Sequence, residues 1–349
     1  MAHLIDSMAF VGQTPWHGLG NQLTAKQPIE IWAEQAGMNW TIEQSPVHFM
    51  ADQGNPKHPD QPIQLKDSLL HLPYNNILPF TDHKVLFRSD TKQPLSIVSQ
   101  RYHMVQPRQI LEFYRDLTEK SDFELETAGV LKGGKKLWAL ARTGQSASIK
   151  GKDVTNGYVL LATACDGTLA TTAQFTSILV VCNNTLAIAL RESNGKSNSA
   201  NSFSNQGIVK VPHNTKFDAA SVKQQLGISV SAWDEYIYRL NLLSDRKVKP
   251  VEADRFLWNV FNDGNSSSSV SGGFNERAIN KAKTLFEGHG RGAMLQSARG
   301  TAFGLLNAIT EFVDHERKAK STDHRLDSAW FGTGAAVKQR ALDLAVQMI

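Results

Sequence analysis

Two successive β-hairpin patterns in the middle of the chain constrain its fold more than any other feature. Apolar and polar residues alternate before Gly133-Gly134, which allow the positive φ of a two-residue turn, and a second strand pattern follows. A similar pair surrounds Asp166-Gly167. The strand patterns cover residues 123–131, 135–142, 157–164 and 168–181. Four strands in direct succession favour a largely antiparallel β meander.

Helical patterns flank this meander on both sides. Residues 107–120 place Pro107 in a first turn and repeat apolar residues at helical spacing. Asn183 or Asn184 suits the N-cap of a helix directly after the fourth strand. Further helices are predicted at 24–37, 219–243, 251–261, 275–287, 300–318 and 333–348, and short strands at 40–49, 85–88 and 96–105. The predicted class is α+β: a central, largely antiparallel β meander with packed helices, followed by a helical C-terminal region.

These patterns divide the 349 residues into three parts. Residues 1–84 form an N-terminal helix and strand segment with an irregular insertion at 51–84, where Pro and Gly are frequent. Residues 85–217 form a basic α+β core, and residues 218–349 form the helical C-terminal region.

The two cysteines, Cys165 and Cys182, have no metal-ligand spacing and end apolar strands, which is typical of buried, unreactive thiols. No signal-peptide pattern precedes the first strand, and no apolar run approaches the roughly 20 residues of a membrane span. We therefore expect a cytoplasmic protein with no membrane contact and no cofactor.

Charge is unevenly distributed along the chain. Residues 130–216 contain ten Lys and Arg but three acids, a net +7, which leaves −3 for the rest of a chain of net charge +4. Such asymmetry favours a polyanionic partner for the central region, although scattered solubilising lysines would give the same count.

The most concentrated charge lies around the Gly133-Gly134 turn, at Lys132, Lys135 and Lys136. Lysines of this kind suit contact with a phosphate backbone, and Trp138 beside them would stack on an unpaired base. The alternative for Trp138 is a core position, alternating inward in its strand.

A second basic segment is the loop GHGRGAMLQSARG at 288–300, where Arg291 and Arg299 flank backbone amides suited to a phosphate. The alternative is a plain connection between helices. The predicted nucleic-acid-binding residues are Lys132, Lys135, Lys136, Trp138, Arg142, Lys150, Lys152, Arg191, Arg291 and Arg299.

Several motifs together resemble the phage/plasmid-like family catalogued as domain of unknown function 932. They are TPWHGLG near the start, SQRYHMVQP at 99–107, AGVLKGGKKLWALAR at 128–142, the DG…VVCNNTLAIAL block at 166–190 and the tail from 300 to 344. The resemblance implies a gene of mobile elements, with no catalytic residues to assign. The predicted core is also similar, at the level of fold, to single-strand annealing proteins of the RecT, Erf and Rad types, which form rings or filaments.

The leading hypothesis is a non-enzymatic protein that binds single-stranded DNA or RNA, anneals it and assembles as a homo-oligomer. The absence of a P-loop motif in the sequence agrees with annealing, which needs no nucleotide hydrolysis. One alternative is a metal-dependent nuclease or hydrolase using His17 or Cys165. Another is an interaction (anti-defence) protein that binds a host protein through its helical region.

Overall fold

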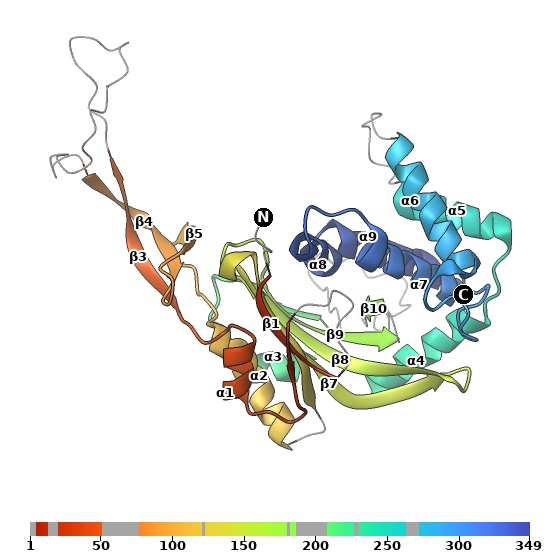
Figure 1. Cartoon of the computed structure of the whole chain (residues 1–349), viewed down its shortest axis with the longest axis horizontal. Helices are drawn as coiled ribbons and strands as arrows, with labels where there is room; N and C mark the ends of the chain where they lie inside the picture. Colours follow the sequence, from red (N-terminus) through yellow and green to blue (C-terminus); the bar gives the residue numbers. More distant parts are fainter. Residues whose placement is uncertain are drawn as a thin grey trace, which may run out of the picture.

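The computed structural model describes residues 5–12, 20–50, 77–120, 123–179, 182–185, 208–226, 230–262 and 272–349. Within them the chain is α+β, with an eight-stranded sheet, a separate three-stranded sheet and a C-terminal group of helices (Figure 1). The predicted fold class is therefore confirmed.

The large sheet contains the predicted meander. Strands β6 to β9 pair antiparallel in succession, and β1 continues the sheet beyond β6. The order is β10-β9-β8-β7-β6-β1-β2, with β11 also on β9 and only the β1–β2 pair parallel among these described strands. Their bounds are β1 Ile5–Val11, β2 Asn21–Leu23, β6 Glu124–Leu131, β7 Lys136–Ile149, β8 Asp153–Ala164, β9 Thr171–Leu179, β10 Cys182–Thr185 and β11 Ile208–Val211.

The small sheet forms an arm that projects from the body (Figure 1). It has the order β3-β4-β5, with all pairs antiparallel, and its strands are β3 Ile42–Met50, β4 Ile77–Arg88 and β5 Pro94–Ser99. Residues 77–84, predicted to be irregular, are therefore strand, because they pair with β3. Residues 51–76 lie outside the described residues.

Two further local predictions are wrong. Residues Cys182–Thr185 form β10 and not a helix start, because Asn183 and Asn184 pair with Ile178 and Ser177 of β9; residues 186–190 lie outside the described part. The first hairpin turn is also longer than two residues. Leu131 pairs with Lys136, and Lys132–Gly134 between them form a short 3-10 turn with φ values of 55°, 71° and 101°.

Helices and loops cover both faces of the meander. On one face Tyr114 of α2 is fully buried, and its hydroxyl lies 2.8 Å from the carbonyl oxygen of Ala139 and 3.0 Å from that of Val159. On the other face Trp330 and Phe331 of α8 pack on an apolar cluster centred on Trp138. The core therefore lies on both sides of the sheet, and α8 joins the C-terminal helices to it.

The C-terminal region is helical, as predicted, but its helices are shorter and more numerous than the sequence pattern indicates. Helix α7 is buried along its whole length. Helix α8 was not predicted. The helices are α1 Ile29–Gln35, α2 Pro107–Lys120, α3 Ala219–Leu226, α4 Val230–Asp245, α5 Pro250–Phe261, α6 Gly272–Thr284, α7 Ala302–Glu311, α8 Thr322–Phe331 and α9 Thr333–Val346, with wide turns at Leu285–His289 and Phe312–Glu316. In the described part of the chain, none of these helices has the length and apolar character needed to cross a membrane.

Candidate nucleic-acid interface

The lysines of the first hairpin are paired inside the protein. Lys132 Nζ lies 2.6 Å from Oδ2 of Asp327 in α8, and Lys136 Nζ contacts the other oxygen of the same carboxylate. The Lys136 side chain is 6% exposed, and its ammonium also lies 5.5 Å from the centroid of the Phe331 ring. We call Lys132, Lys136 and Asp327 the hairpin latch, because they tie the β6–β7 turn to α8.

The electrostatics of the latch favour its ionised form. Burial alone would raise the pKa of Asp327, but hydrogen bonds from Lys132 and Lys136 outweigh that effect, and the pKa lies below its ordinary value. The carboxylate therefore stays charged and offsets one of the two lysine charges, so the latch keeps a net charge of +1. Asp327 therefore reduces the repulsion between Lys132 and Lys136 within the protein itself.

Trp138 is 2% exposed and belongs to the core. Its ring meets that of Trp330 edge-on, with centroids 4.8 Å apart. The prediction that Trp138 stacks on bases is therefore corrected, because a base cannot reach the ring. The alternation of Lys136, Trp138 and Leu140 places all three on the face that α8 covers.

The remaining hairpin cations are partly enclosed. Lys135 is half-buried, and its carbonyl oxygen accepts a hydrogen bond from the Cys165 amide at 2.9 Å. Arg142 is half-buried and donates to Asn156 Oδ1 at 2.9 Å. The first hairpin therefore presents Lys135 and Arg142 only partly at the surface, although no carboxylate pairs with Lys135 in the described part of the chain.

A different pair of predicted segments does come together at the surface. Asp153 is buried at the end of the β7–β8 turn, and its Oδ2 accepts a hydrogen bond from the Ser297 amide at 2.8 Å. This contact places Lys152 of the turn next to the loop that contains Arg299. Both side chains are exposed.

Lys247, which the sequence did not single out, completes this surface. Its backbone bridges Thr301, and its ammonium donates to the Arg299 carbonyl at 3.2 Å. Within the described part of the chain, no carboxylate pairs with Lys152, Lys247 or Arg299. We call these three residues the turn–loop cluster. Nearby, Lys150 pairs with Asp245 of α4.

Arg291 lies in the same loop but is held differently. Its backbone amide donates to both carboxylate oxygens of Glu311, at 3.1 and 3.0 Å. Glu311 is 4% exposed, so a buried acid occupies the amide that was predicted to face a phosphate. At Arg291 the loop therefore serves as a connection between helices, which was the alternative prediction for this segment. The Arg291 side chain itself is exposed. Arg191 lies outside the described residues.

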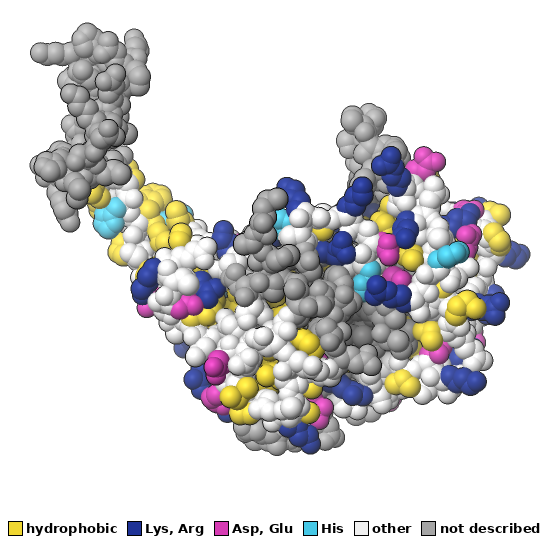
Figure 2. Space-filling model, in the orientation of Figure 1, with side chains coloured by type: hydrophobic (Ala, Val, Ile, Leu, Met, Phe, Trp, Pro, Cys, Tyr) yellow, Lys and Arg dark blue, Asp and Glu magenta, His cyan; other side chains and the backbone are white. Residues whose placement is uncertain are grey.

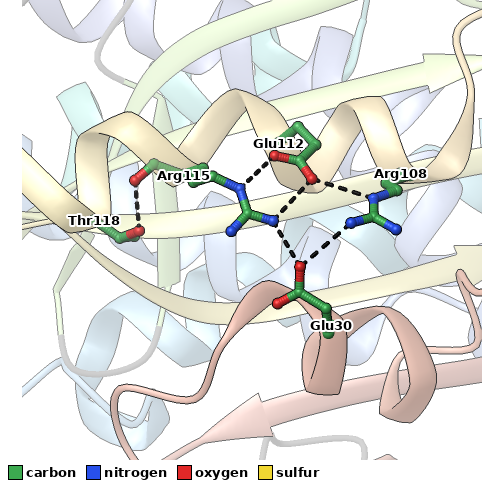
Figure 3. Close-up of polar contacts among 5 residues, drawn as sticks. All are labelled: Glu30, Arg108, Glu112, Arg115 and Thr118. Carbon is green, nitrogen blue, oxygen red and sulfur yellow. Dashed lines mark hydrogen bonds and ion pairs between the residues drawn. The ribbon is translucent and has the colours of Figure 1, made fainter.

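At the contact between α1 and α2, exposed cations are matched by acids. Between α1 and α2, Glu30 accepts from Arg115 at 2.8 Å and from Arg108 at 3.3 Å, and Glu112 binds both arginines (Figure 3). The charges of this network cancel, so it is not a basic surface. Figure 2 shows other Lys and Arg side chains spread over the helical side of the molecule, with fewer acids among them.

The residues suggested for an enzyme show no activated group in the described region. Cys165 is a buried free thiol whose Sγ lies 3.4 Å from the Lys135 carbonyl oxygen, and burial raises its pKa to about 12. Such a thiol is a poor nucleophile at neutral pH. His17 lies outside the described residues, and those residues contain no group of three His, Cys, Asp or Glu placed to hold a metal.

The fold and site together define an α+β protein. It has a β-meander sheet, C-terminal helices that the hairpin latch ties to the sheet, and a small exposed basic surface. Residues 94–330 match the family model described as "Domain of unknown function (DUF932)". The match covers more than half of the chain, so the chain belongs to this family, and the resemblance drawn from the motifs is confirmed. No curated protein and no solved structure matches the chain.

Proposed function

We propose that this protein binds single-stranded nucleic acid, DNA or RNA, through the turn–loop cluster and promotes annealing of complementary strands. The observation that supports this proposal is the convergence of Lys152, Lys247 and Arg299, from three distant segments, on one surface. Each is exposed, and none has a carboxylate partner in the described residues. Three unmatched cations in one place favour an anionic partner.

The chemistry of these side chains suits the nucleic-acid backbone more than the bases. Lysine is a mobile point charge that contacts phosphates without reading sequence. Contacts of this kind leave base edges free to pair, as annealing requires. We assign the hairpin latch no part in this binding, because Asp327 already pairs with both of its lysines and the Lys136 side chain is buried.

A cluster of three cations neutralises few phosphates, so one copy alone would bind weakly. Affinity would increase if several copies engaged one strand, because each further contact is then intramolecular. We therefore propose that the protein acts as a homo-oligomer, in a ring or filament.

The test is binding to a fluorescent single-stranded oligonucleotide of about 16 nucleotides, the upper end of known site sizes, across a salt series. Log affinity should fall with log salt by about 0.7 for each phosphate neutralised. The variant Lys152→Ala/Lys247→Ala/Arg299→Ala should bind at least tenfold more weakly, with a shallower slope.

The matched control is Lys26→Ala/Arg101→Ala/Lys216→Ala, which removes the same charge from exposed positions that also have no carboxylate partner in the described residues. It should bind like wild type. If both triple variants lose affinity equally, net charge and not the turn–loop cluster determines binding. If wild type binds no strand at all, the proposed function is wrong. Strand annealing is then measured with the variants that still bind.

A further inference from the structure

A small cavity of about 220 Å³ lies between α6 and the wide turn at Phe312–Glu316. Its lining combines four cations, one acid and an aromatic ring. They are Arg277, Lys281, Arg317, Lys318, Glu316 and Phe312. None of them was predicted from the sequence as a site residue, and none belongs to the turn–loop cluster.

The positive charge of the cavity is mostly uncompensated. Lys281 pairs with Glu316 at 3.0 Å. Within the described part of the chain, Arg277, Arg317 and Lys318 have no carboxylate partner. The cavity therefore holds a surplus of cations that an anion would balance.

Arg317 is the most informative of these cations. It is half-buried, and its guanidinium makes one long hydrogen bond, 3.5 Å to Ser328 Oγ. Burial lowers its pKa from the ordinary arginine value. A guanidinium that has lost water and gained no acid has donors left for a ligand, and a phosphate fits the planar fork as a bidentate partner.

The wall of the cavity is apolar. Phe312 is 8% exposed and is held edge-on by Phe261, with centroids 5.4 Å apart. A fixed aromatic ring can receive a flat or apolar group. The cavity is smaller than the roughly 300–1,000 Å³ of sites for drug-sized ligands, so it suits one base or sugar with its phosphate at the cationic rim.

We propose that this cavity binds a single phosphorylated nucleotide, with the phosphate at Arg277, Arg317 and Lys318 and the base or sugar against Phe312. The nucleotide can be a free nucleoside monophosphate or one unit of a bound strand. The proposal goes beyond strand binding by the turn–loop cluster, because it rests on different residues and elements.

The test is calorimetric titration of the full chain with AMP, adenosine and inorganic phosphate. AMP should bind more tightly than either fragment, since only AMP engages both the cations and the ring. Arg277→Gln/Lys318→Gln should weaken AMP binding at least tenfold, because a hydrogen bond to a charged group is worth about that factor.

The control is Arg255→Gln/Lys320→Gln, which removes two exposed cations that do not line the cavity. This variant should bind AMP like wild type. Arg317→Gln, with its fold checked by circular dichroism, should also lose AMP binding. Absence of AMP binding by wild type, or equal binding by Arg277→Gln/Lys318→Gln, would overturn the proposal.

A competition experiment identifies the source of the nucleotide. If an oligonucleotide of about 16 nucleotides displaces a fluorescent AMP analogue, a strand unit fills the cavity; if it does not, the ligand is a free nucleotide. The turn–loop triple variant should retain AMP binding in either case. If this variant loses strand binding but keeps AMP binding, the two sites are independent. The failure of one proposal can then be told apart from the failure of the other.

Discussion

Two turns of the large sheet, β6–β7 and β7–β8, are both rich in lysine, but their lysines lie in different surroundings. At the β6–β7 turn, Lys132 and Lys136 both pair with Asp327 of α8, and the Lys136 side chain is buried. At the β7–β8 turn, Lys150 pairs with Asp245, whereas Lys152 is exposed, and this turn lies beside the Lys247 and Arg299 segments. The denser cluster in the sequence is paired inside the protein, and the sparser cluster is exposed.

The difference shows that local charge density does not define a basic surface. The carboxylate that neutralises Lys136 lies 191 residues away in the chain. The exposed cluster likewise depends on contacts between distant segments. What decides the role of a lysine is the acid that tertiary structure places beside it.

The largest expected effect comes from breaking the hairpin latch. Asp327→Ala leaves Lys136 nearly buried without its acid, which should lower the free energy of unfolding by about 3 kcal/mol, as for other buried pairs that lose one partner. Urea unfolding measures this change. Asp245→Ala, which removes the exposed acid beside Lys150, should cost less than about 1 kcal/mol. Equal losses in the two variants would show that the latch is an ordinary surface pair.

For strand binding, a change beside the turn–loop cluster should matter more than a change in the latch. If the cluster binds the strand, Asp245→Asn should increase the affinity for single strands, because it removes an acid near the cluster. The gain should be at most about fivefold, the range of exposed charge interactions. Glu43→Gln, in an exposed pair with Lys92 on the arm, is the matched control and should change nothing. An unchanged affinity for Asp245→Asn would place the strand elsewhere.

The latch also predicts a dependence on pH. The pKa of Asp327 is lower in the folded protein than its ordinary value of 3.8, so the charged carboxylate stabilises the fold at and above that pH. This stabilisation should be lost as the pH falls below 3.8 towards the lower folded pKa. The difference in unfolding free energy between wild type and Asp327→Asn should therefore shrink over that acidic window. A constant difference would mean that Asp327 is not charged in the fold.

A smaller effect concerns the thiol. Because burial raises the pKa of Cys165 to about 12, its reaction with a thiol reagent at neutral pH should be slow in the folded protein and rapid in denaturant. Mass spectrometry of the tryptic peptide checks this. Rapid modification of Cys165 in the folded protein would show that the thiol is reactive and would support a catalytic role for it.

Much of the fold follows from local sequence patterns. Alternation and Gly turns are sufficient for the β6–β9 meander, and Pro107 with helical spacing is sufficient for α2. Helix α8 was missed because Thr322–Phe331 mixes polar residues with two aromatics at its end. Strand β10 was missed because asparagines that suit an N-cap also fit a strand that folds back on β9.

The candidate site was less predictable, although one signal was present. Lys136 falls in the same alternation as Trp138 and Leu140, so it occupies an inward position where a lysine needs an acid. That signal predicts a buried ion pair without identifying Asp327. Lys247 gave no signal, because its position beside Arg299 arises only from the contact between the 247 and 301 segments.

The central claim is that the turn–loop cluster, and not the β6–β7 hairpin, binds single-stranded nucleic acid. The most direct measurement is lysine acetylation of the native protein, with and without a saturating single-stranded oligonucleotide, followed by mass spectrometry. We predict that Lys152 and Lys247 react readily in the free protein and are protected by the strand, whereas Lys136 is unreactive in both states. Strand-dependent protection of Lys132 and Lys135, with Lys152 and Lys247 unaffected, would contradict this account.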